Sequence, residues 1–585
     1  MRLSGRRCPS PRPVVLAWLL LAVAAAPVWS RADLTRAFLT GDALLRAPVP
    51  NEAFTAPHDA RLPDTEFHGR LTFVVRPSNL RIRILRDALG IGRDARAPFP
   101  VLPPFDVELS QVDGRLVPAR RGPIPHARGT HEWSVGPGRV WSEPGDGDAA
   151  RASVPVALVE KNANCVHNGL LTFLFDRQGK VERVAMQIVQ ETCSYFQFDL
   201  AGTAEAATSP LPDGLAAQIA ARWRAESANR LPVRPIEALR ETAPAVDPAG
   251  FGASAEVSPG AMSSFGVVWR GVHYVSGCAT RFGPYPYCDE LLLPSYSVAK
   301  SVVAGLALMR MELLEPGIRH AKLVDLVPAC AQEGEWEGVT LDHLLDMTTG
   351  RYRSVLREAD ENDMPASGFF NVLTHEEKLQ IACTRFPRRE SPGLRWVYHT
   401  SDTYLLGTAL TAAWRRHHPG GDWYRELLGR PLWNRLGLSP EAGFTRRTTD
   451  SEAQPFAGWG LTLLRDDVAK LAVFINAGTG ASAGARLVDA TELQSALQRR
   501  PEDPGLTAAA PDLRYQNGFW AWNAAQALQC PRDLWIPFMS GFGGISVVLL
   551  PNGAVYYYFS DGSEFRFARA VRTASQLAPL CQAAP

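Results

Sequence analysis

The stretch Ser297-Val-Ala-Lys300 decides the fold of this 585-residue chain, because it opens an apolar segment with helical periodicity and is the only Ser-x-x-Lys in the sequence. Four apolar residues recur along one face of that segment: Val298, Val302, Leu306 and Met309. The spacing predicts a helix over residues 297–314 with Ser297 at its N-terminus. Residues three positions apart share a helix face, so the Ser297 hydroxyl and the Lys300 amine are expected to touch.

This pair has the chemistry of a nucleophile and its base. A serine hydroxyl becomes a good nucleophile when a base takes its proton, and a lysine is such a base when burial lowers its pKa. The helix N-terminus adds backbone donors for a developing oxyanion. The chain has only six lysines among its 61 basic residues, and apolar neighbours favour burial of Lys300. A solvated lysine on a helix surface is the alternative interpretation.

Five segments, in chain order, extend the pattern. They are Leu293-Pro-Ser-Tyr-Ser-Val-Ala-Lys-Ser301, Val339-Thr-Leu-Asp-His-Leu-Leu-Asp-Met-Thr-Thr-Gly350, Tyr398-His-Thr-Ser-Asp-Thr-Tyr-Leu-Leu-Gly407, Ala457-Gly-Trp-Gly-Leu461 with Arg465-Asp-Asp-Val-Ala469, and Met539-Ser-Gly-Phe-Gly-Gly544. Together they resemble the landmarks of the β-lactamase-related serine hydrolases, which include penicillin-recognising enzymes, esterases, D-amino peptidases and nylon-oligomer hydrolases. The resemblance implies an α+β fold, in which an antiparallel sheet flanked by helices meets a helical subdomain at the active site.

The resemblance also implies residue roles. Ser297 would attack the carbonyl, Lys300 would accept its proton, and Tyr398 would share the proton relay and help activate water. The backbone N–H groups of Ser297 and Phe542 would form the oxyanion hole. The residues expected to contact substrate are Thr400, Met539, Ser540, Gly541 and Trp520. The reaction would need no cofactor and no metal.

Two positions depart from the family pattern. Thr400 stands where many members have Asn, and Met539 stands where Lys or His is usual. Methionine cannot supply the charge that recognises a substrate carboxylate. An ester or amide without that carboxylate is therefore the expected substrate, either a small molecule or an oligomer. The alternatives are an enzyme of the β-lactamase or D-Ala carboxypeptidase type, and a non-catalytic binding protein that retains the fold.

A rival serine-hydrolase pattern also occurs in the chain. Gly480-Ala-Ser-Ala-Gly484 matches the Gly-x-Ser-x-Gly nucleophile elbow of α/β-hydrolases. Such an elbow must connect a strand to a helix, whereas this match lies in a run of small residues typical of a flexible loop. The sequence therefore favours Ser297 over Ser482.

The chain is predicted to divide into five segments. Residues 1–30 have a basic start and an apolar core, which indicates a signal peptide and export to the periplasm or beyond the cell; an uncleaved anchor is the alternative. Residues 31–60 are expected to form an irregular lead-in, and 61–205 a β-rich accessory domain whose ligand no motif indicates. Residues 206–254 read as a connector with a helix at 215–227. The hydrolase domain would occupy 255–585. Hairpins are predicted at residues 170–189 of the accessory domain and, in the hydrolase domain, at the turns Arg270-Gly271 and Pro551-Asn552-Gly553.

Composition and cysteines limit the remaining possibilities. Hydrophobic residues make up 46% and charged residues 21%, a globular composition, and no stretch after the signal segment is apolar enough to span a membrane. The net charge of +1 gives no general electrostatic case for a nucleic-acid partner. No feature of the sequence indicates the oligomeric state.

Eight cysteines follow the signal segment, and pairing neighbours in sequence predicts these disulfides: Cys165–Cys193, Cys278–Cys288, Cys330–Cys383 and Cys530–Cys581. Buried free thiols are the alternative.

Overall fold

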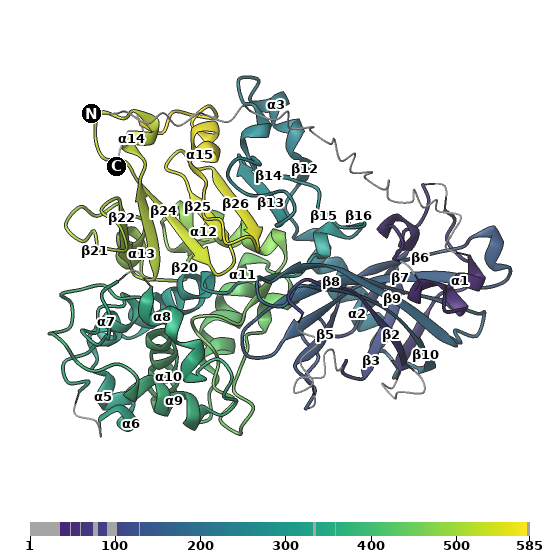
Figure 1. Ribbon diagram of the computed structural model, residues 1–585, viewed down its shortest axis with the longest axis horizontal. Coiled ribbons are helices and arrows are strands. Elements are labelled where there is room, and N and C mark those ends of the chain that lie inside the picture. Colours follow the sequence, from purple (N-terminus) through teal and green to yellow (C-terminus); the bar gives the residue numbers. More distant parts are fainter. Residues whose placement is uncertain are drawn as a thin grey trace, which may run out of the picture.

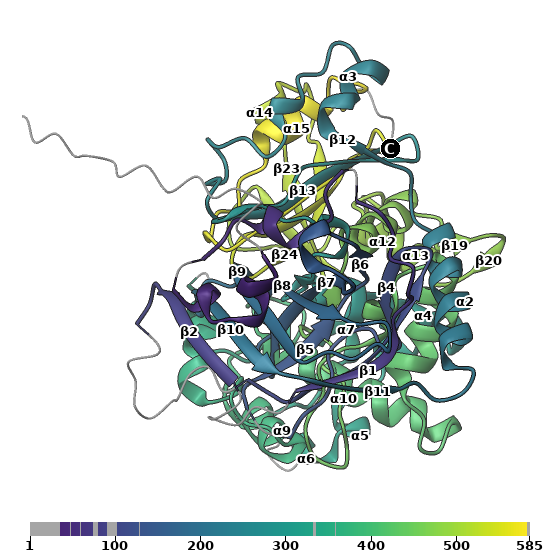
Figure 2. The ribbon, with the colours of Figure 1, turned by 90° about the vertical axis from the view of Figure 1, so that its right-hand side faces the viewer.

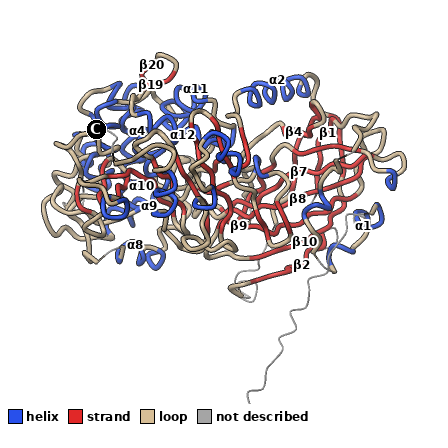
Figure 3. The backbone as a smooth tube through the Cα atoms, turned by 90° about the horizontal axis from the view of Figure 1, so that it is seen from above, coloured by secondary structure: helices blue, strands red, loops and turns tan. Residues whose placement is uncertain are grey.

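Two large sheets organise the chain and lie side by side (Figure 1). The computed structural model describes residues 35–581, apart from 47, 59, 74–79, 91–101, 128, 332–334 and 357. The predicted signal segment at 1–30 lies outside the described residues. Seen from above, the strands of the N-terminal sheet gather at one end of the molecule and most helices gather at the other (Figure 3).

The N-terminal sheet is antiparallel, with the strand order β11-β1-β3-β4-β6-β7-β8-β9-β10-β2 and with β5 paired to β7. Its strands are β1 (His68–Phe73), β2 (Leu80–Asp87), β3 (Phe105–Val112), β4 (Arg115–Pro118), β5 (His131–Val135), β6 (Gly138–Trp141), β7 (Ala150–Glu160), β8 (Val166–Phe175), β9 (Arg183–Thr192), β10 (Phe198–Glu205) and β11 (Ala207–Pro210). The predicted hairpin at 170–189 is formed by β8 and β9. Asp176 makes the turn, because its carboxylate accepts the backbone N–H groups of Gln178 and Lys180.

The segments on either side of this sheet are more ordered than the sequence suggests. Residues expected to be an irregular lead-in form α1 (Arg36–Thr40) and two short 3₁₀ helices, 43–45 and 51–54. Leu39, Leu44 and Phe54 are buried there, at 2% exposure or less, in the largest hydrophobic core. These apolar side chains anchor the segment to the core. Their spacing in a proline-containing stretch follows neither a helix nor a strand period, so the sequence does not predict this order.

The expected connector at 206–254 bridges both sheets. It begins with β11, which pairs with β1, and continues through α2 (Leu215–Ala228), close to the predicted helix. Near its end β12 (Val233–Pro235) pairs in parallel with β14 of the second sheet, and α3 (Leu239–Thr242) follows. The segment is thus built into the fold, because its strands complete the edge of each sheet.

The second sheet has the order β12-β14-β13-β26-β25-β24-β23-β22-β21 and is antiparallel except for the β12–β14 pair. Its other strands are β13 (Met262–Trp269), β14 (Val272–Val275), β21 (Leu506–Thr507), β22 (Leu513–Gln516), β23 (Phe519–Asn523), β24 (Trp535–Gly541), β25 (Ile545–Leu549) and β26 (Val555–Ser560). Two-residue strands pair β15 (Ala279–Thr280) with β16 (Gly283–Pro284), β17 (Leu293–Pro294) with β18 (Thr462–Leu463), and β19 (Ala481–Ser482) with β20 (Ala485–Arg486). The predicted hairpins turning at Arg270-Gly271 and at 551–553 are both present.

Helices cover both faces of the second sheet. Alternate residues of β25 and β26 pack toward α12 (Arg465–Ala477) on one face and toward α15 (Ala568–Ala574) on the other. The remaining helices are a π-helical turn η9 (Lys300–Gly305), α4 (Leu306–Leu314), α5 (Leu323–Leu326), α6 (Pro328–Ala331), α7 (Leu341–Leu345), α8 (Ala359–Asp363), α9 (His375–Thr384), α10 (Thr400–His417), the π-helical η12 (Tyr424–Trp433), α11 (Asn434–Leu436), α13 (Ala490–Ala496) and α14 (Ala525–Leu528). Helices α5–α10 form a helical layer below the sheet in Figure 1.

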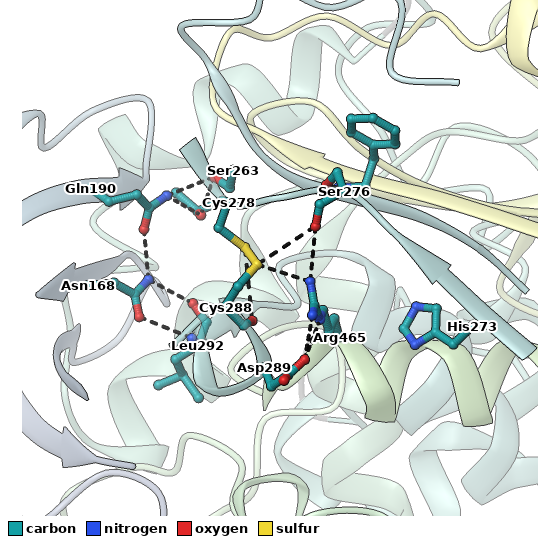
Figure 4. Close-up of a disulfide and its surroundings, with 12 residues drawn as sticks. Asn168, Gln190, Ser263, His273, Ser276, Cys278, Cys288, Asp289, Leu292 and Arg465 are labelled. Atoms are coloured by element: carbon teal, nitrogen blue, oxygen red, sulfur yellow. Dashed lines mark hydrogen bonds and ion pairs between the residues drawn. A yellow bond between two sulfur atoms is a disulfide. The ribbon is translucent and has the colours of Figure 1, made fainter. Parts of the chain in front are cut away.

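Buried polar contacts join the two halves of the molecule. Arg121 of the N-terminal half is 6% exposed, and its guanidinium contacts three carboxylates: Glu226, Glu290 and Glu441. Asn168 on β8 exchanges two hydrogen bonds of 3.0 Å with the backbone of Leu292 (Figure 4). Figure 2 shows the N-terminal sheet in front of the second sheet and its helices. Separating the halves would leave these buried charges and amide groups without partners, which is energetically costly. The contacts therefore fix the relative position of the halves.

Four disulfides complete the framework: Cys165–Cys193, Cys278–Cys288, Cys330–Cys383 and Cys530–Cys581. These are the pairs expected from sequence order. The Cys278–Cys288 bond lies at the junction of the halves, beside Arg465 and Ser276 (Figure 4). None of the helices in the described part of the chain combines the length and apolar character that crossing a membrane requires.

Candidate active site

The chain reverses direction immediately before Ser297. Strand β17 ends at Pro294, and Tyr296 then takes a left-handed conformation with φ of +40°. A helix follows over residues 298–314, here called the Ser297 helix, as the apolar periodicity predicts. Tyr296 and Val298 are buried, whereas Ser297 between them is partly exposed. This strained turn leaves the hydroxyl at the surface of an otherwise buried segment.

Lys300 contacts Ser297 as the spacing predicts. Its Nζ donates to Ser297 Oγ at 2.8 Å, to Thr400 Oγ1 at 2.9 Å and to the Gly458 carbonyl at 3.3 Å. The side chain is 1% exposed. Burial lowers the pKa of Lys300 to about 8, although the carboxylates of Glu361 and Asp402 partly oppose this. A buried lysine is thus held against a serine hydroxyl with a pKa close to neutral.

The glycine at position 458 allows the carbonyl contact. A Cβ there would lie 2.1 Å from Thr403 Oγ1 and 3.6 Å from Lys300 Nζ. Only a residue without a side chain lets this backbone approach the lysine so closely.

Tyr398 lies over the same pair. Its ring centroid is 5.0 Å from Lys300 Nζ, and the residue is 9% exposed, two positions before α10. Burial raises the pKa of Tyr398 well above its ordinary value, and a hydrogen bond with Ser297 only partly opposes this. The phenol is therefore neutral at physiological pH and can pass a proton, whereas part of the Lys300 population is unprotonated there and can accept one.

Thr400 and Glu361 extend the network beneath Lys300. Thr400 is 2% exposed; its hydroxyl accepts from Lys300 and donates to the Glu361 carboxylate. The same carboxylate accepts the backbone N–H of Thr400 at 2.8 Å, at the start of α10. Thr400, expected to contact substrate, instead links Lys300 to a carboxylate. Sequence reasoning missed Glu361, which lies in α8 outside every family landmark.

His399 holds α8 against α10. Its imidazole lies 3.2 Å from Asp360 and 3.4 Å from Asp402, and it stacks on Phe386. Burial disfavours the charge on this ring, but Asp402 and Asp360 outweigh that effect and raise the pKa of His399 to about 9. Asp360 precedes Glu361, so this buried cation also fixes the carboxylate beneath Lys300. His399 therefore has a structural role within the segment 398–407.

Strand β24 runs up to the turn before Ser297. A Cβ on Gly541 would lie 2.8 Å from the Ser295 carbonyl, so the strand approaches because this residue is glycine. Phe542 follows directly, and its ring lies 5.7 Å from that of Tyr296. The N–H groups expected to form the oxyanion hole, those of Ser297 and Phe542, thus belong to adjoining segments. Phe542 itself is 52% exposed.

Two residues expected to contact substrate lie in the interior. Met539 is 1% exposed and belongs to the hydrophobic core that contains the Ser297 helix. Trp520 is 8% exposed and packs on Tyr398, with ring centroids 6.1 Å apart. Ser540 is half-buried. Alternation along β24 turns the Met539 side chain toward the core, and its contact with substrate stays a prediction.

The rival elbow does not have the required geometry. Residues 480–484 form part of the β19–β20 hairpin, with Ser482 paired to Ala485. A nucleophile elbow joins a strand to a helix, and this one joins two short strands. Ser297 is the better candidate.

Comparisons with known proteins place the chain in a family. The family model described as "Beta-lactamase" matches residues 264–565. A search of curated proteins found no match. Similar solved structures include EstCE1, a hydrolase with promiscuous acyltransferase activity (17% identity, 60% of this chain and 99% of that chain, TM-score 0.42). They also include a penicillin-binding protein homolog from Caulobacter crescentus (18%, 58% and 96%, 0.40) and a D-stereospecific amidohydrolase from Streptomyces sp. (13%, 57% and 97%, 0.38). The matched domain covers half of the chain, and this protein therefore belongs to the beta-lactamase family, with an N-terminal region outside the family domain.

Proposed function

We propose that this protein hydrolyses an ester or an amide through an acyl-enzyme on Ser297, with Lys300 as the general base. The observation that carries the proposal is the 2.8 Å contact between Lys300 Nζ and Ser297 Oγ. The lysine is buried, and its pKa of about 8 leaves a usable neutral fraction near pH 7. A solvated surface lysine would have neither property.

The reaction begins when neutral Lys300 takes the proton of Ser297 and Oγ attacks the substrate carbonyl carbon. The N–H groups of Ser297 and Phe542 receive the developing oxyanion. As the tetrahedral intermediate collapses, the bond to the leaving group breaks, and Tyr398 passes the proton from Lys300 to that group. A water molecule then attacks the acyl carbon and gives its proton to the same relay. The bond between that carbon and Ser297 Oγ breaks, Oγ takes the proton from the relay, and the acid leaves.

Thr400 and Glu361 support the base through this cycle. Protonated Lys300 has three N–H donors, and Ser297, Thr400 and Gly458 supply three acceptors. When the lysine becomes neutral, the Ser297 hydroxyl can donate to it, while Thr400 keeps Nζ in place. The Glu361 carboxylate favours the charged form, so it helps Lys300 to receive the proton.

The surroundings of Ser297 favour a substrate without a carboxylate. The Met539 side chain offers no cation and lies in the core. The half-exposed ring of Phe542 presents an apolar surface beside the turn that carries Ser297. We therefore expect a neutral ester or amide with an apolar acyl or aryl group. The four disulfides favour an oxidising compartment and hence export.

Turnover of three substrate classes tests this proposal. Purified protein is assayed with p-nitrophenyl esters, D-amino-acid p-nitroanilides and nitrocefin, beside Ser297→Ala and Lys300→Met. We expect turnover of the ester or the anilide that both substitutions abolish, and little turnover of nitrocefin. Strong nitrocefin hydrolysis would refute the argument from Met539. Binding without any turnover would favour a non-catalytic protein.

A further inference from the structure

A turn of the N-terminal sheet reaches the segment that carries Ser297. Residues 161–165 connect β7 to β8, and Asn164 at their end is fully buried with φ of +86°. Cys165, its neighbour, is joined to Cys193 after β9. The turn therefore belongs to the region outside the family domain, yet it is anchored against the turn that precedes Ser297.

A single oxygen of Asn164 binds three groups around the site. Its Oδ1 accepts the Tyr296 N–H at 3.2 Å, the Ser295 hydroxyl at 3.3 Å and the Gly460 N–H at 3.2 Å. Tyr296 directly precedes Ser297, and Gly460 follows two residues after the carbonyl that accepts Lys300. The amide thus ties together the two backbone segments that hold the nucleophile and its base.

This contact acts where the backbone is strained. A tyrosine with φ of +40° lies in a region that non-glycine residues seldom adopt, and such a conformation persists only when its surroundings fix it. The Tyr296 N–H would otherwise be a buried donor without an acceptor. Tyr195, which follows the Cys193 end of the same disulfide, adds a second contact, because its ring lies 6.1 Å from that of Phe542.

We infer that the N-terminal sheet is an integral part of the active site and that Asn164 is a positioning residue for Ser297. The inference rests on the proposed acyl-enzyme function. Without the amide oxygen, the turn at 295–296 relaxes and moves Ser297 Oγ away from Lys300. A displacement of about 1 Å at a reacting atom lowers the rate by about 10²-fold.

The test compares two buried asparagines of the N-terminal half, one in the turn between β7 and β8 and one on β8. Asn164→Gly removes the amide at a backbone conformation that suits glycine, and Asn164→Asp keeps an oxygen acceptor. The matched control is Asn168→Ala, which removes two hydrogen bonds to Leu292 across the same junction but none to the turn before Ser297. Each variant is measured for its rate of Ser297 labelling by a fluorophosphonate, its kcat and KM for an ester, and its melting temperature.

We expect Asn164→Gly to lower the labelling rate and kcat by about 10²-fold, with a much smaller change in KM. Asn164→Asp should keep most of the wild-type labelling rate and kcat. Asn168→Ala should lower the melting temperature, while the labelling rate and kcat per folded molecule stay unchanged. If Asn164→Gly does not fold, Asn164→Ser takes its place with the same expectation. Wild-type rates in the Asn164 variants, or an equal loss in Asn168→Ala, would overturn the inference. Absence of label on Ser297 in the wild-type protein would instead refute the proposed function.

Discussion

Replacing Glu361 by Gln should move the pH dependence of hydrolysis. Lys300 must be neutral to accept the Ser297 proton, so the rate rises as pH rises through its pKa of about 8. At pH 7 only about a tenth of such lysines are neutral. The Glu361 carboxylate, linked to Lys300 through the Thr400 hydroxyl, raises this pKa. Its removal therefore lowers the pKa and shifts the rising limb toward lower pH.

The size of the shift follows from the short path between the charges. One hydroxyl separates Lys300 from Glu361, and an opposite charge within about 4–6 Å commonly moves a pKa by about 1–3 units. We expect the limb to move by about one unit, so that the neutral fraction at pH 7 rises from about a tenth toward about a half. Gln keeps the shape of the side chain and can still accept one of the two Thr400 hydrogen bonds.

The assay is kcat/KM for a p-nitrophenyl ester across neutral and mildly alkaline pH. Asp363→Asn is the matched control, because Asp363 lies on the same short helix and pairs with Arg385 at the surface. Its profile should coincide with that of the wild-type protein. If the Glu361→Gln limb stays in place or moves to higher pH, Glu361 does not act on Lys300 and the proposed support for the base is wrong.

Three further changes test the surroundings of the site. The pKa of His399 is raised from an ordinary 6.5 to about 9, so the charged imidazole contributes about 3 kcal/mol to the free energy of unfolding. This contribution is fully present below pH 6.5 and is lost as pH rises through about 9. Urea midpoints of the wild-type protein and His399→Gln should converge over that range, and a constant difference would contradict the buried ion pair. Met539→Ala should cost about 2–5 kcal/mol by leaving a cavity, with ester turnover per folded molecule retained, whereas a loss of turnover without a loss of stability would assign Met539 to the substrate site. Trp520→Ala should cost about 3–5 kcal/mol in the same unfolding assay, because the ring packs on Tyr398, and an unchanged midpoint would show that it is not a core residue.

The sequence predicts the parts of the site that lie close together along the chain. Apolar periodicity places Ser297 and Lys300 on one helix, and the scarcity of lysine points to its burial. Alternating strands and turn residues predict the hairpins around Gly271 and Gly553, which the structure contains. These features depend on local backbone geometry, which short patterns encode directly.

The rest of the site depends on contacts between distant segments. Asn164 lies 132 residues before Tyr296 in the chain, and no periodicity or motif relates the two. Glu361 lies in a five-residue helix outside every landmark, and only the packing of α8 on α10 directs it to Thr400. The place of Met539 in a motif predicts contact with substrate, yet the register of β24 turns the side chain inward. Side-chain direction in such cases follows from tertiary packing.

Mapping the site of covalent labelling shows directly whether Ser297 is the nucleophile. The native protein is treated with a fluorophosphonate, digested and examined by peptide mass spectrometry, beside Ser297→Ala and Ser482→Ala. We expect one adduct on the peptide that contains Ser297, absent from Ser297→Ala and unchanged in Ser482→Ala. An adduct that persists in Ser297→Ala, or a native protein that takes no label, would contradict this expectation.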